Sequence, residues 1–197
     1  MNYWHHRINY CRDVAIALLE KNLLAIGFSD IAIQYPKIIL ELPSKIELKS
    51  MILYSYQNRY NITVFVEDKR NDKFIEKPLP QHWVLFNFLY EFKVGDRIVM
   101  LNYPTKEQFI IYEIVEQANA IGNLPIKKFI ALDGQEVTLQ DGLLRWNYIK
   151  FIDLGFFIKI KPLTCPIEGT IRGFKSTNSS LNHIGVQLEK IVEENKL

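Results

Sequence analysis

Aromatic residues beside short polar segments are the residues of this chain best suited to specific chemistry. Aromatic rings stack on flat heterocycles such as nucleobases, and adjacent polar groups hydrogen-bond the base edge. The Asp30 carboxylate, for example, can accept a hydrogen bond from an exocyclic amine. The candidate base-binding residues are Trp4, Phe28, Ser29, Asp30, Trp146 and Tyr148. The alternative, that these rings simply fill the core, stays open for each of them.

A second group of side chains is suited to phosphate. Arginine binds phosphate oxygens in a bidentate manner, lysine acts as a point charge, and threonine donates through its hydroxyl. The candidate phosphate-binding residues are Arg145, Lys150, Arg172, Lys175 and Thr177. An ordinary solvated surface explains the same residues about equally well.

Metal-dependent chemistry has only a superficial pattern in its favour. Asp30, followed by Glu47 and Lys49, fits the Asp…Glu-x-Lys spacing of a metal-dependent nuclease. However, Ser44 and Glu47 form a capping box, which places Glu47 at the start of a helix. The adjacent histidines His5 and His6 point to opposite faces if they lie in a strand, so they cannot share one pocket. We therefore expect no metal site.

Conventional enzyme motifs are missing from the sequence. It has no phosphate-binding glycine loop and no nucleophile elbow, and Cys11 and Cys165 lack the partners that thiolate catalysis requires. We expect no catalytic residues and no cofactor, and hence a protein that is not an enzyme.

Hydrophobic periodicity predicts how these residues are positioned. We expect strands at 3–9 and 23–28 on either side of a helix that spans 13–22. The further expected strands are 61–66, 97–103, 109–116, 126–132, 145–152 and 156–162. The further expected helices are 45–57, 80–92 and 181–195. The charged run 67–77 is expected to be a solvated loop.

Four landmarks in this order resemble a known superfamily. They are Trp4 in the first strand, the segment Gly27-Phe28-Ser29-Asp30, the turn Val94-Gly95-Asp96-Arg97-Ile98-Val99, and the segment Arg172-Gly173-Phe174-Lys175-Ser176-Thr177-Asn178. Together they resemble PUA-like domains, in particular the EVE-like modules at the front of bacterial modification-dependent restriction proteins. The resemblance covers about residues 3–180. Residues 32–80 match nothing in it, and the family often has Trp where this chain has Phe28.

The resemblance implies an α+β fold, namely a PUA-like small mixed β-barrel with flanking helices and a C-terminal helical extension. Residues 1–165 would form the PUA-like domain, and residues 166–197 a polar segment and a C-terminal helix. The implied function is to read a modified base, in DNA rather than RNA, as the sensor of a restriction or anti-phage system. The base would flip into a pocket between Trp4 and Phe28. The implied partner is a nuclease or ATPase, as a subunit or a domain.

The charge composition of the chain counts modestly against nucleic-acid binding. Lysine and arginine (24) barely exceed aspartate and glutamate (22), so the net charge is only +2 and phosphate binding would need a local basic patch. With two isolated cysteines, no secretory signal and no long apolar run, we expect a cytoplasmic protein with no membrane partner.

Two alternatives remain open from the sequence. The first is a protein-interaction module that docks through one face of its last helix, formed by Ile184, Leu188, Ile191 and Val192. The second is the metal-dependent nuclease with Asp30, Glu47 and Lys49.

Overall fold

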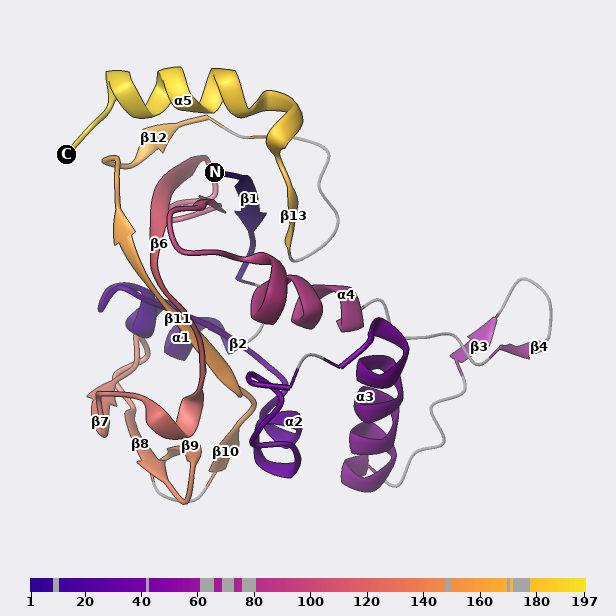
Figure 1. The fold of residues 1–197 in the computed structure, drawn as a ribbon. Coiled ribbons are helices and arrows are strands. Elements are labelled where there is room, and N and C mark those ends of the chain that lie inside the picture. The colour runs from indigo at the N-terminus through magenta and orange to yellow at the C-terminus, as the bar shows by residue number, and fades with distance from the viewer. Residues whose placement is uncertain are drawn as a thin grey trace.

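The computed structural model describes residues 1–8, 11–41, 43–60, 66–68, 73–75, 81–147, 150–169, 171 and 178–197. In these residues the chain is an α+β protein in which helices flank two larger sheets (Figure 1). The expectation of an α+β fold is therefore confirmed.

The larger sheet has seven strands in the order β13-β1-β5-β6-β11-β2, and β12 also pairs with β6. The first strand, β1, runs parallel to β5, whereas every other pair in this sheet is antiparallel. Within the described residues β13 and β2 do not pair with each other, so the sheet is open. The strands are β1 (Tyr3–His6), β2 (Leu23–Ile26), β5 (Arg97–Leu101), β6 (Gln108–Ala120), β11 (Phe156–Pro162), β12 (Ile167–Glu168) and β13 (Asn178–Ser180).

A second, antiparallel sheet has the order β10-β9-β8-β7. Its strands are β7 (Lys128–Ile130), β8 (Glu136–Gln140), β9 (Leu143–Trp146) and β10 (Lys150–Ile152). The expectation of one strand over 145–152 is wrong because the chain reverses: Asn147 has a left-handed φ of 44°, and Trp146 pairs back with Lys150. The loop expected over 67–77 is also wrong in part, since β3 (Val66–Asp68) and β4 (Lys73–Ile75) pair there.

The helices lie beside these sheets. They are α1 (Arg12–Leu19), α2 (Ser29–Gln34), α3 (Lys45–Tyr60), α4 (Gln81–Phe86) and α5 (Gly185–Glu194), with two 3₁₀ turns, η2 (Ile121–Asn123) and η3 (Asn182–Ile184). The helix α4 continues as a π-helix, η1 (Asn87–Glu91). The capping box is confirmed, because the Ser44 amide donates to Glu47 Oε2 (2.6 Å) and the Glu47 amide donates to Ser44 Oγ (3.2 Å). None of the described helices is both long enough and apolar enough to cross a membrane.

Three apolar clusters hold the elements together. The first lies between the larger sheet and the helices α3, α4 and η1, and contains Leu48, Phe88, Ile98 and Phe156. The second packs α1 against the second sheet. The third packs α5 onto the larger sheet through Val99, Leu188 and Val192. A fully buried side chain of this size is stabilised by about 1.5–3 kcal/mol relative to an exposed one.

The carboxylate of Asp96 joins the two parallel strands at their beginnings. Asp96 is 3% exposed, and its oxygens accept hydrogen bonds from the Asn2 amide (2.7 Å), the Trp4 indole (3.1 Å) and the Lys93 amide (3.3 Å). The Asp96 backbone also pairs with Ile114 of β6. One side chain thus fixes both the start of β1 and the turn that leads into β5.

A second polar contact joins α5 to the same strands. The Tyr3 hydroxyl donates to Glu189 and accepts from Arg97, which in turn pairs with Glu189. Burial is the main cause that raises the pKa of Tyr3, to about 12, so the phenol stays protonated. The hydrogen bonds from Tyr3 and Arg97 lower the pKa of Glu189. The last helix therefore binds the strands through charge as well as apolar packing.

We expect Asp96→Ala to lower the free energy of unfolding by about 3 kcal/mol. The substitution leaves the buried indole donor of Trp4 and the part-buried amides of Asn2 and Lys93 without their acceptor, and a hydrogen bond to a charged group contributes about 1.5–3 kcal/mol. Chemical denaturation measures the difference, with the exposed carboxylate variant Glu193→Ala as control. A decrease of less than about 1 kcal/mol in the free energy of unfolding would show that the Asp96 carboxylate does not hold β1 and β5 together.

Candidate functional site

The junction of β2 and α2 gathers three of the predicted base-binding residues. Phe28 has a left-handed φ of 67°, which turns the chain sharply from the strand into the helix. Ser29 is fully buried, and both its amide (3.0 Å) and its hydroxyl (2.5 Å) donate to the Asp153 carboxylate. Phe28 is partly buried against the first apolar cluster, and Asp30 is half-buried in the first turn of α2.

A close backbone contact holds this junction in place. A Cβ on Gly155 would lie 2.5 Å from the carbonyl of Phe28, so only glycine fits between β10 and β11 at this point. The Gly155 amide donates to the carbonyl of Ile26 (2.8 Å). The beginning of α2 is thus fastened to the segment that follows β10.

Trp4 and Ser29 lie inside the protein rather than at an open pocket. Trp4 is 9% exposed, its ring packs on Phe92 with a centroid distance of 5.1 Å, and its indole donates to Asp96. The Ser29 hydroxyl is engaged by Asp153. The Trp4 ring therefore fills the core rather than lining a base-binding pocket, and its indole donor has a buried partner there.

The β9–β10 hairpin carries the other predicted residues that the structure describes. Trp146 is half-buried against the second apolar cluster, and Lys150, its cross-strand partner, is exposed. Arg145 lies on the opposite face of β9, and its Nε is buried without a hydrogen-bond partner among the described residues. Trp146 and Arg145 therefore face opposite sides of the sheet, and they do not share a pocket. The candidates Tyr148, Arg172, Lys175 and Thr177 lie outside the described residues.

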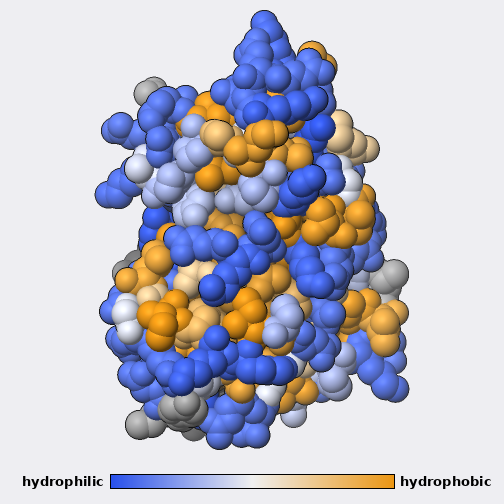
Figure 2. Space-filling view, turned by 90° about the vertical axis from the view of Figure 1, so that its left-hand side faces the viewer, coloured by the Kyte–Doolittle hydropathy of each residue, from blue (hydrophilic) through white to orange (hydrophobic). Residues whose placement is uncertain are grey.

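Neither rival assignment gathers its residues into a site. In the described part of the chain no three His, Cys, Asp or Glu side chains form a cluster that could hold a metal ion. Glu47 uses its carboxylate in the capping box. Leu188 and Val192 of α5 are each 1% exposed in the third cluster, so the apolar face of this helix is already occupied. On the side shown in Figure 2, hydrophobic patches are separated by hydrophilic residues.

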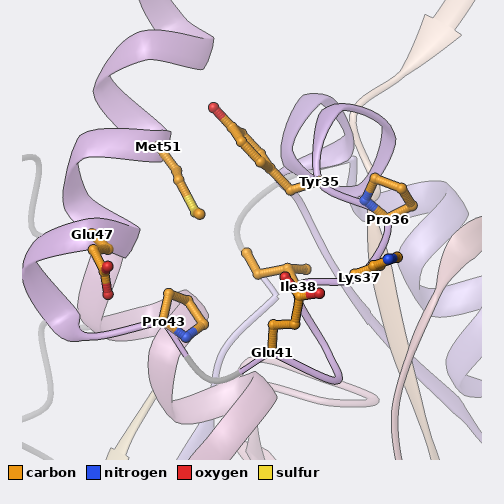
Figure 3. Close-up of a pocket in the computed structure, with 8 residues that line it drawn as sticks. All are labelled: Tyr35, Pro36, Lys37, Ile38, Glu41, Pro43, Glu47 and Met51. Atoms are coloured by element: carbon orange, nitrogen blue, oxygen red, sulfur yellow. The ribbon is translucent and has the colours of Figure 1, made fainter.

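The structure reveals a groove that the sequence did not indicate. It has a volume of about 560 Å³ and lies between the chain that follows α2 and the first turns of α3. The lining residues are Tyr35, Pro36, Lys37, Ile38, Glu41, Pro43, Glu47 and Met51. Figure 3 shows Tyr35 and Met51 on opposite sides of the groove, with Ile38 and Glu41 below them. Met51 and Glu47 lie one helical turn apart, a spacing that would have put them on one face of the expected helix.

The floor and the polar groups of the groove are held by the surrounding elements. The carbonyl of Ile38 accepts a hydrogen bond from the Tyr90 hydroxyl (2.6 Å), which ties the floor to η1. Burial raises the pKa of Tyr90 to about 12, so this donor stays protonated. Hydrogen bonds from Ser44 lower the pKa of Glu47, which is therefore ionised at neutral pH. The groove accordingly offers one ring, one thioether, two carboxylates and the ammonium group of Lys37.

Both histidines of β1, His5 and His6, are buried. The Nδ1 of His5 lies 2.8 Å from Ser179 Oγ, whereas the Nδ1 of His6 has no hydrogen-bond partner among the described residues. Burial, with a contribution from the neighbouring His5, lowers the pKa of His6 to about 3. His6 is thus neutral in the folded protein at any ordinary pH.

We expect His6 to make the protein less stable as the pH falls below 6.5. Below pH 6.5 the imidazole of His6 takes up a proton in the unfolded chain but not in the folded chain. The free energy of unfolding therefore falls by about 1.4 kcal/mol for each pH unit between 6.5 and the folded pKa, and His6 causes no loss above pH 6.5. Denaturation curves at several pH values measure this slope. His6→Gln removes the contribution, and the exposed His183→Gln serves as the control. Equal slopes in wild type and His6→Gln would contradict the assignment.

Comparison of the chain with models of known families, with curated proteins and with solved structures finds no match in any of the three.

Proposed function

We propose that this protein binds nucleic acid and reads a modified base in DNA through the groove between Tyr35 and Met51. The groove itself carries the proposal. Its volume of about 560 Å³ lies in the range of small-molecule sites, about 300–1,000 Å³. A flipped base is held between aromatic and apolar side chains, and Tyr35 and Met51 face each other in this way.

The carboxylates of the groove provide for recognition of the base edge. Carboxylate oxygens accept hydrogen bonds from the exocyclic amine of cytosine or adenine. Glu41 and Glu47 both line the groove, and a carboxylate that caps a helix with one oxygen keeps further acceptor sites. Met51 and Pro43 offer apolar surface for a methyl group on the base. The base must leave the duplex to enter, because the groove has room for a single base rather than a helix.

The arrangement of the strands supports a PUA-like module. The order β1-β5-β6-β11-β2, with a parallel first pair among antiparallel neighbours, gives a mixed sheet on which the proposed PUA-like module is built. The long pairing of β6 with β11 contains register shifts, which bend a sheet toward closure. In this proposal α2 and α3 are additions that supply the groove.

The proposed role is that of a sensor without catalytic activity. In a restriction or anti-phage system, recognition of the base would direct a nuclease or ATPase that is present as a partner subunit or domain. Phe28 and Asp30 lie at the start of α2, at the end away from Tyr35, and neither lines the groove.

The first test compares binding to short duplexes that carry unmodified cytosine, 5-methylcytosine, 5-hydroxymethylcytosine or N6-methyladenine, at two salt concentrations. We expect a preference of tenfold or more for one modification, which is about 1.4 kcal/mol. Weak binding that is equal for all four duplexes and sensitive to salt would overturn the assignment as a reader.

The second test assigns the preference to the groove. Tyr35→Ala removes the stacking ring, so we expect the preferred duplex to lose at least tenfold in affinity while unmodified DNA is bound as before. Tyr54→Ala is the matched control, because Tyr54 is 56% exposed on α3 and does not line the groove. If both variants keep the preference, the groove is not the reading site.

A further inference from the structure

The outer face of the second sheet carries a row of directly opposed side chains. Lys128 pairs with Thr138, Thr138 pairs with Arg145, and Arg145 pairs with Phe151. Opposed residues in antiparallel strands project from the same face of a sheet. The intervening residues Val137, Leu144 and Ile152 belong to the second apolar cluster, so the row lies on the face turned away from it.

Two neighbours in this row have buried polar atoms without partners. Thr138 is 6% exposed, and its Oγ1 has no hydrogen-bond partner among the described residues. In that same part of the chain, the Nε of Arg145 is also buried and unpartnered. Buried polar atoms in native proteins are almost always paired, and an exception points to a bound water, ion or ligand. Two exceptions on directly opposed residues point to one shared partner.

The charges of the row favour an anion as that partner. In the strand register Thr138 stands between two cationic residues, Lys128 on one neighbouring strand and Arg145 on the other. Lys128 forms an ion pair with Glu136, and its side chain is 59% exposed. The planar fork of donors of Arg145 matches the oxygens of phosphate. A phosphate group accepts from the guanidinium and from the hydroxyl at the same time.

We propose that Arg145 and Thr138 form a phosphate-binding site on the outer face of the second sheet. Its ligand is a phosphate oxyanion, either free in solution or in a nucleic-acid backbone. The site stands by itself, whereas its assignment to a backbone rests on the proposed function. The proposed function calls for such a site, because the groove is lined by two carboxylates, Glu41 and Glu47, against one cation, Lys37. Asp153, which directly follows β10 of this sheet, accepts a hydrogen bond from Ser29 at the start of α2. The proposed phosphate site and the groove therefore belong to adjoining elements.

The first experiment uses inorganic phosphate. Thermal unfolding is followed in increasing phosphate against chloride at constant ionic strength, with wild type, Arg145→Gln, Thr138→Val and the exposed control Arg12→Gln. Because a ligand of the folded state stabilises it, we expect a saturable rise in Tm for wild type and the control only. Thr138→Val should also raise Tm in chloride, because it removes an unpartnered hydroxyl. No rise in wild type, or a rise that persists in both site variants, would overturn the site.

The second experiment distinguishes the source of the phosphate. Binding of a short duplex is measured over a range of salt concentrations, and a lost backbone contact reduces the slope of log K against log salt by about 1. We expect this reduction for Arg145→Gln and not for Arg12→Gln. A phosphate-dependent Tm with an unchanged slope would keep the site and overturn its assignment to the backbone. A phosphate-dependent Tm without any binding of DNA would overturn the proposed function alone.

Discussion

The buried carboxylate of Asp96 is the contact on which the rest of the structure depends. It joins β1 to β5, two strands whose first residues are more than ninety positions apart, at the only parallel pairing in the described sheets. Parallel strands cannot be joined by a tight turn, so their alignment must be set by tertiary contacts. Trp4, whose indole donates to Asp96, belongs to the first apolar cluster and packs there on Phe92.

The consequences of this joint extend to both ends of the chain. Because β1 is aligned with β5, Tyr3 and Arg97 lie side by side and together bind Glu189 of α5. The apolar face of α5 then packs onto the sheet, which leaves it unavailable to a partner protein. At the other edge of the sheet, the contact between Gly155 and Phe28 sets the direction of α2 and so the position of Tyr35.

The two proposed sites differ in the charge of their side chains. A groove lined by Glu41 and Glu47 suits a base with exocyclic donors, whereas a row with Arg145 and Thr138 suits a phosphate. In the proposed function, the low net charge of +2 would be offset by positive charge placed locally rather than spread over the surface. Under that proposal, the groove would contribute specificity and the sheet would contribute affinity.

The sequence by itself determined the α+β class, the limits of β11 and the capping box of Ser44 and Glu47, because these follow from periodicity and short-range hydrogen bonds. It also placed the turn at Gly95 and Asp96. Only the tertiary structure decided that Trp4 is a core residue, that Trp146 and Arg145 face opposite sides of a sheet, and that Tyr35 and Met51 face each other. Those facts depend on which residue from a distant part of the chain makes the contact: Asp96 hydrogen-bonds Trp4, and Asp153 hydrogen-bonds Ser29. Local patterns specify the elements, but the pairing of elements far apart in the chain specifies what each side chain contacts.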